Sequence, residues 1–136
     1  MSIDALEIIK NAMKEMKLSY SFMEYKIKSG ETLPKTYFIG EYQELEPTSE
    51  DGEQDNVFIL TGFSRDTWIR LEEAKNKIKK YFPLIEGKTA TTESGSVVAV
   101  FYSNGFPVPT EDAELKKMQI NLTVKEWRKS DEKIRN

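Results

Sequence analysis

The sequence contains neither cysteine nor histidine. Without cysteine, the chain has no disulfide, no zinc–thiolate site and no thiol nucleophile. Without histidine, it lacks the commonest general base and the commonest metal ligand, so no Ser–His or Cys–His pair can form. Any catalysis would therefore depend on carboxylate, lysine or tyrosine side chains alone.

Long apolar runs and an excess of positive charge are also missing. No apolar segment approaches the ~20 residues needed to cross a bilayer, and the N-terminal segment lacks the apolar centre and cleavage site of a secretory peptide. The net charge is −3, whereas nucleic-acid-binding proteins are usually basic. We therefore expect a protein made inside a cell, with no membrane partner and no direct role in reading nucleic acid.

The composition nevertheless predicts a packed core. The chain has 136 residues, including seven Phe, six Tyr and two Trp, and disordered chains lack such aromatic content. A chain of this length buries roughly two thirds of its unfolded surface. We expect a single domain over residues 1–136, with a core of about residues 3–127 and a charged, frayed tail over residues 128–136.

Two segments have the periodicity of amphipathic helices. Over residues 3–18 the apolar positions recur at spacings of three and four, and Ser2 or Asp4 can cap the start. Residues 64–82 form the second predicted helix, with Ser64 or Asp66 as the cap and Pro83 as the stop. The stripe predicted to be buried on it consists of Trp68, Leu71, Ala74, Ile78 and Tyr81 or Phe82.

Five segments read as strands, at residues 20–28, 35–44, 56–63, 96–106 and 115–127. In the last of these, apolar residues alternate with polar ones, which places Met118, Ile120, Leu122 and Val124 inward. The helices are too few to cover a parallel sheet on both faces. We therefore predict an α+β fold, with a mostly antiparallel four- to five-stranded sheet and two helices packed on one face.

An acidic run connects two of these strands. Seven acids and no base occur between Glu41 and Asp55, and the pattern DGEQDN does not match an EF-hand loop. A solvated loop, or a loop that meets a basic partner, is the favoured interpretation. The candidate residues for partner or lumen contact are Glu44, Glu46, Glu50, Asp51, Glu53 and Asp55.

A basic patch lies near the end of the second helix, at Lys75, Lys77, Lys79 and Lys80. Cations are favoured there by the helix dipole, so an ordinary solvated helix face is one interpretation. The other is an inter-subunit contact with the acidic loop of a neighbouring copy, as in a heterologous interface that closes into a ring. The polar outer face of residues 115–127 offers a further place for a neighbour to pair.

No motif indicates an enzyme. Neither GxGxxG nor GxxxxGK[ST] occurs, so no phosphate-binding loop is implied. Carboxylates are so numerous that spacing does not single out a catalytic pair. We expect no enzymatic activity, no metal and no cofactor.

The order of these segments resembles a known family. The segments LPKTYFIGEYQE, VFILTGF and DTWIRLEEAKNKIKKYF, followed by SVVAVFYSNGF and LKKMQINLTVKEW, are similar in layout to the tail-terminator, or tail-completion, proteins of long-tailed bacteriophages. The likeness is greatest to versions encoded in prophages of Gram-positive bacteria. It spans residues 3–127 and includes no catalytic motif.

This resemblance implies a non-enzymatic virion protein, assembled in the host bacterial cytoplasm. Such proteins form a hexameric ring at the head-proximal end of the tail, where the ring stops growth of the tube and joins it to the head. Its partners would be the tail tube protein and a head-completion, or neck, protein, while DNA only passes through the lumen. Residues 44–56 would be the loop that docking orders, or that repels DNA from the lumen wall.

Two other classes of function remain open at this point. The chain could be a stand-alone acidic module, such as a regulatory or anti-host phage protein, that grips one basic partner. It could also be an enzyme that uses carboxylates and tyrosine, which a concave pocket with convergent buried carboxylates would favour.

Overall fold

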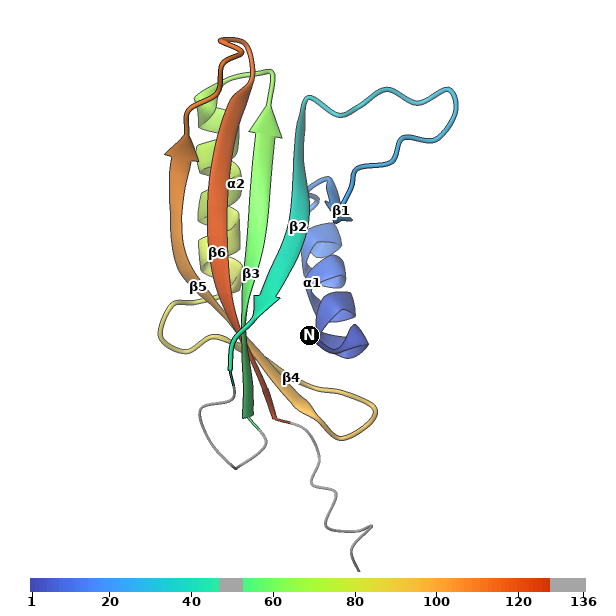
Figure 1. Ribbon diagram of the computed structural model, residues 1–136, viewed down its shortest axis with the longest axis vertical. Coiled ribbons are helices and arrows are strands. Elements are labelled where there is room, and N and C mark those ends of the chain that lie inside the picture. Colours follow the sequence, from blue (N-terminus) through green and yellow to red (C-terminus); the bar gives the residue numbers. More distant parts are fainter. Residues whose placement is uncertain (47–52, 128–136) are drawn as a thin grey trace, which may run out of the picture.

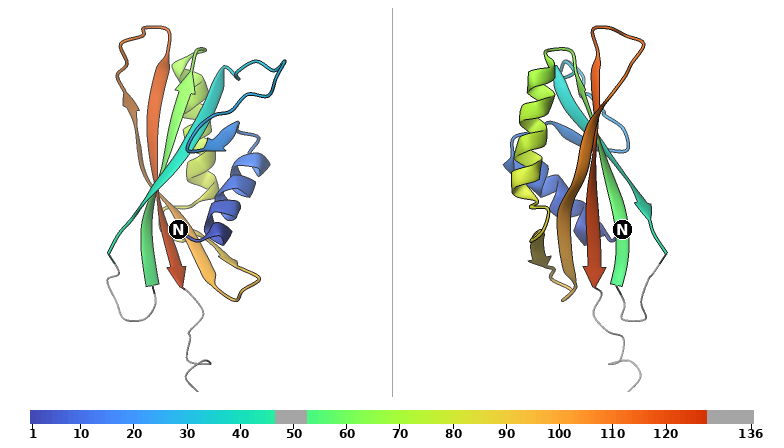
Figure 2. Two further views of the ribbon diagram at one scale, coloured as in Figure 1. Left: turned by 45° about the vertical axis from the view of Figure 1, so that its right-hand side comes forward. Right: turned by 90° about the vertical axis from the view of Figure 1, so that its left-hand side faces the viewer.

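A computed structural model describes residues 1–46 and 53–127 of the chain. Two helices lie on one face of a strongly twisted six-stranded sheet (Figures 1 and 2). The elements in chain order are α1 (Ile3–Glu15), β1 (Tyr20–Phe22), β2 (Thr36–Glu44), β3 (Glu53–Ser64), α2 (Trp68–Tyr81), β4 (Lys88–Thr91), β5 (Val97–Val108) and β6 (Lys116–Trp127). The predicted α+β class with two helices is confirmed.

The details of the sheet correct the prediction. Its strand order is β1-β2-β3-β6-β5-β4, and β1 runs parallel to β2 while the other pairs are antiparallel. The sheet is therefore mixed and has six strands, not four or five. Strand β4 was missed because its sequence KTAT has no apolar alternation. Strand β1 is shorter than residues 20–28, because Met23 takes a left-handed φ of 67° and turns the chain away.

The centre of the sheet is formed by β3, β6 and β5. Met118, Ile120, Leu122 and Val124 of β6 are all buried, as their alternation predicted. Strand β6 lies between β3 and β5 and pairs with both along its length. Strand β6 therefore has no free edge. The prediction that this strand pairs with a strand of a neighbouring copy is wrong.

The helices follow the predicted stripes with shorter bounds. Ser2 caps α1, since its Oγ accepts the Ala5 N–H at 3.1 Å. The helix ends three residues before Leu18, because Lys17 takes a φ of 59°. Neither helix of the described residues is long and apolar enough to cross a lipid bilayer.

The start of α2 differs from the prediction. Its N-cap is Thr67, which makes no side-chain capping bond, while the Ser64 Oγ accepts the Asp66 N–H within the preceding turn. Leu71, Ala74 and Ile78 are buried as expected. Trp68 is exposed, because the helix begins at this residue and its first turn lies at the margin of the core.

Two glycines let aromatic rings lie directly against the sheet. A Cβ on Gly62 would approach Phe38 Cε2 to 2.5 Å, and a Cβ on Gly40 would approach Phe58 Cζ to 2.6 Å. Real Cβ atoms do not tolerate such approaches, so the rings fill the space that side chains would take. This packing fixes the position of β2 against β3 and supports the surfaces described next.

Candidate interaction surfaces

The acidic run is shorter as a loop than the sequence suggested. Strand β2 extends through Glu44 and strand β3 begins at Glu53, so Glu44 and residues 53–56 belong to strands and not to the predicted loop over residues 44–56. Strand β3 extends this far because it pairs with β6, with Glu53 opposite Trp127 and Asp55 opposite Lys125. Glu50 and Asp51 lie outside the described residues.

The side chains of the acidic run that the structure describes lie in different environments. The Glu44 carboxylate contacts the amino group of Met1, on the helix side of the sheet, and Glu46 is exposed. Asp55 faces Lys125 on the opposite side, with its Oδ1 buried and without a hydrogen bond. Within residues 1–46 and 53–127, no three acidic side chains gather into a group that could hold a metal ion.

The four lysines of α2 also separate. Lys75 pairs with Glu72 at 2.8 Å, and the Lys79 ammonium lies 5.6 Å from the ring centre of Tyr102 on β5. Lys77 instead donates to the Met16 carbonyl at the end of α1, at 3.3 Å. Lys80 is exposed and has no partner among the described residues. The set is therefore not one patch: Lys75 and Lys77 make contacts within the chain, and Lys79 and Lys80 lie near the loop that follows α2.

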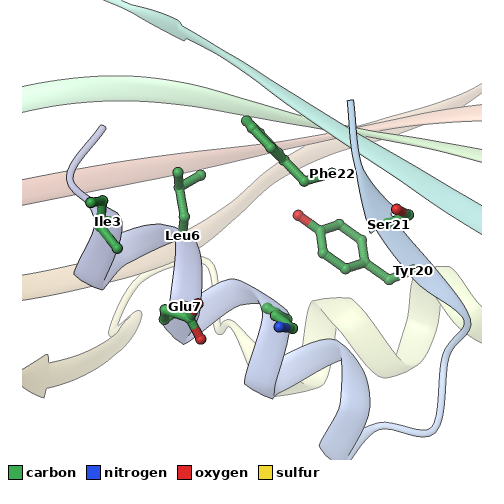
Figure 3. A pocket seen from close by; sticks show the side chains of 7 residues that line it. Ile3, Leu6, Glu7, Tyr20, Ser21 and Phe22 are labelled. Atoms are coloured by element: carbon green, nitrogen blue, oxygen red, sulfur yellow. The ribbon is translucent and has the colours of Figure 1, made fainter. Parts of the chain in front are cut away.

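Sequence reasoning missed a hollow between α1 and β1. We call it the α1–β1 hollow; it has a volume of about 390 Å³ and is lined by Ile3, Leu6, Glu7, Lys10, Tyr20, Ser21 and Phe22. Figure 3 shows Tyr20 and Phe22 pointing from β1 toward Leu6 on α1. Its wall is mainly apolar, with one acid and one base at the rim.

The floor of this hollow is rigid and uncharged. The Phe22 ring stacks against Tyr42 at 6.0 Å and against Phe58 at 6.4 Å between ring centres. Burial raises the pKa of Tyr20 above its usual range, so this phenol is neutral at physiological pH. The hollow therefore suits an aliphatic side chain better than a charged one. The acid in its lining is the exposed Glu7.

A free strand edge runs beside the hollow. Strand β1 pairs only with residues 38–40 of β2, and no described strand pairs with residues 41–43 on that side. Strand edges of this kind offer backbone N–H and C=O groups to another chain. Three of the exposed residues at this end of β2 are acidic, namely Glu41, Glu44 and Glu46.

The loop after α2, residues 83–87, forms a protrusion at the other edge of the sheet (Figure 1). Ile85 has 89% of its surface exposed and Leu84 has 56%. They border a shallow depression, together with Phe101 and Lys125 on the open face of the sheet. Gly87 holds the loop against β5, because its φ is 65° and a Cβ there would approach Phe101 to 2.4 Å.

One feature of the sequence could have predicted the exposed protrusion. The segment PLIEG places two aliphatic residues between a proline and a glycine, outside any periodic segment, which is typical of an exposed apolar contact. The hollow left no such signal, since it arises only when α1 and β1 dock.

No protein-family model matches the sequence, and no curated protein shows significant sequence similarity to it.

Proposed function

We propose that this chain is a non-enzymatic tail-completion protein of a long-tailed phage or prophage, which closes into a ring on the tail tube and joins the tail to the head. One observation carries the proposal. A single α+β domain presents two unlike surfaces at opposite edges of its sheet: an apolar hollow beside an acidic strand end, and an apolar protrusion flanked by lysines. Unlike surfaces on one subunit favour head-to-tail assembly, which closes into a ring when the rotation allows it.

The acidic residues at the end of β2 are suited to a contact surface at the end of such a ring. Glu41, Glu44 and Glu46 are exposed at the end of β2, and their like charge would attract a basic tube or neck protein and repel DNA in a lumen. Residues 45–52 lie between β2 and β3, which pair as antiparallel neighbours over residues 36–44 and 56–64. The virion, at the head-proximal end of the tail, is the corresponding location.

The assembly state tests this proposal. We expect the untagged protein to form a closed oligomer of six copies in native mass spectrometry as its concentration is raised. Because exposed charges are screened within about 10 Å at 0.1 M salt, we expect the fraction of oligomer to fall as ammonium acetate is increased. Six-fold masses absent at every concentration, with and without the tail tube protein, would contradict the ring.

The acidic end gives a second test in the parent phage. Replacing Glu46, Glu50 and Asp51 together with lysine is expected to lower the yield of infectious particles at least tenfold, because a tube or neck partner would meet the wrong charge. Asp55 is kept, since its reversal would place a lysine opposite Lys125. The control reverses two acids, Glu111 and Glu114, which are exposed in another loop. Equal yields from the two variants would argue against a role for the acidic end.

A stand-alone binding module is the alternative, and the apolar α1–β1 hollow favours it. In that case the hollow would take a side chain of a basic partner, and residues 41–43 of β2 would pair with that partner's strand. A strict monomer that gains no copies on the tail tube would move the conclusion to this function.

A further inference from the structure

The protrusion and the hollow match in chemistry. Ile85 and Leu84 expose aliphatic surface to water on one edge of the sheet. The α1–β1 hollow on the other edge offers an apolar wall of Leu6, Phe22 and the 78%-exposed Ile3. Each surface carries an unburied apolar area of the kind that marks contact sites. Neither fills the other within one copy, because they lie at opposite ends of the strand order.

Their surrounding charges are also complementary. In the sequence, Lys79 and Lys80 precede the 83–87 loop and Lys88 follows it, so three bases flank the loop's single acid, Glu86. The Lys79 ammonium lies near the Tyr102 ring and the Lys88 ammonium lies 3.7 Å from the centre of the Tyr81 ring, so Lys80 is the member of this set that is most open to a partner. Beside the hollow, residues 41–46 hold three acids and no base; Glu44 already contacts the Met1 amino group, so Glu41 and Glu46 are the acids offered to a neighbour. When the protrusion of one copy approaches the hollow of another, lysines meet glutamates around an apolar centre, which is the usual anatomy of a specific interface.

We propose that Leu84 and Ile85 of one copy of this chain insert into the α1–β1 hollow of the next copy, and that this contact repeats around the assembly. The inference rests on the proposed ring and names the interface that builds it. The contact joins two different patches, so it is heterologous and leaves a free protrusion and a free hollow until the ring closes.

The rigid setting of both surfaces supports this contact. Gly87 allows the loop to pack against Phe101, and the stacked rings of Phe22, Tyr42 and Phe58 support the hollow. Preorganised surfaces lose little conformational entropy on association. The occupant we propose is a second copy of this chain, because it supplies both the apolar protrusion and a lysine beside it to meet the apolar hollow and its acidic surroundings.

Three aspartate substitutions test the contact. I85D damages the protrusion and I3D damages the hollow, while I69D alters a residue on α2 that is 65% exposed and belongs to neither surface. All three positions are exposed, so the variants are expected to fold, which circular dichroism checks. Burial of one isoleucine corresponds to a ten- to hundredfold change in affinity. We expect I85D and I3D to weaken association by that factor and I69D to leave it unchanged.

Mixing cysteine variants then identifies the partners directly. The chain has no cysteine of its own, so I85C and I3C each carry one thiol. A heterologous contact predicts that an oxidised mixture of I85C and I3C gives a disulfide-linked pair containing one of each, in excess of either variant linked to itself. A mixture of I69C and I3C serves as the control, and we expect only background cross-linking.

The outcomes separate this contact from the proposed ring. If the wild type forms six copies but I85D and I3D do not weaken it, or if I85C and I3C fail to link, the contact is overturned and the ring remains. If I85C and I3C link in a protein that never closes into six copies, the contact is supported and the six-copy ring is overturned.

Discussion

Replacing Phe58 with alanine is expected to lower the free energy of unfolding by about 4 kcal/mol. Phe58 is fully buried, and its ring contacts the backbone of Gly40 and stacks against Phe22. The substitution would leave a cavity that the sheet cannot close, because β2 and β3 are held in register over residues 36–44. Urea denaturation followed by tryptophan fluorescence measures the change.

Two comparisons make this prediction specific. Phe106→Ala removes the same side chain from an exposed site on β5, and we expect its effect to stay near 0.5 kcal/mol. Gly40→Ala should destabilise the wild type, because its Cβ would lie 2.6 Å from Phe58 Cζ. The same change should cost less in the Phe58→Ala background, with a coupling of about 1 kcal/mol. Strictly additive effects would show that the ring and the glycine do not share this space.

The second large effect concerns the buried carboxylate of Glu126, and we expect Glu126→Ala to lower the free energy of unfolding by about 3 kcal/mol. Glu126 is 2% exposed and accepts hydrogen bonds from the Ser2 N–H, the Ser2 hydroxyl and the Asn56 side-chain amide. It thereby ties the last strand to the start of α1, where a negative charge is also favoured by the helix dipole.

The size of this loss follows from the donors that remain. Without the carboxylate, the Asn56 amide is left unpaired in a fully buried site, which costs more than losing an exposed bond. Glu126→Gln should recover part of the stability, because it keeps the shape and one accepting oxygen. Glu111→Ala removes an exposed carboxylate and is the control. If Glu126→Ala unfolds at the same urea concentration as Glu111→Ala, the carboxylate does not anchor α1.

Glu126 also shows what the sequence alone does not predict. Its position continues the inward alternation of Val124, Leu122 and Ile120 on β6, so the pattern places it inside. Nothing local indicates that the donors it needs come from Ser2 and Asn56, which are 124 and 70 residues away. The cap predicted at Ser2 is confirmed, but its second role, in donating to Glu126, depends on how α1 meets the sheet.

The acidic run illustrates a related limit. The prediction placed Glu53 and Asp55 in a loop because acids and turn formers dominate residues 47–56. In the structure, backbone pairing with β6 extends β3 through these residues. Pairing across a sheet is available only when a distant strand supplies it, so tertiary context overrides local propensity. The missed strand β4 has the same origin, since it forms only along the edge of β5.

The sequence by itself determined the chemistry that is impossible without cysteine and histidine, the α+β class, the two amphipathic helices and the buried side of β6. These depend on composition and on short-range periodicity, which the sequence shows directly. The tertiary structure alone decided the strand order, the α1–β1 hollow and the separation of the four lysines. Those features arise where segments distant in the sequence meet, and no local pattern encodes which surfaces remain open after they pack.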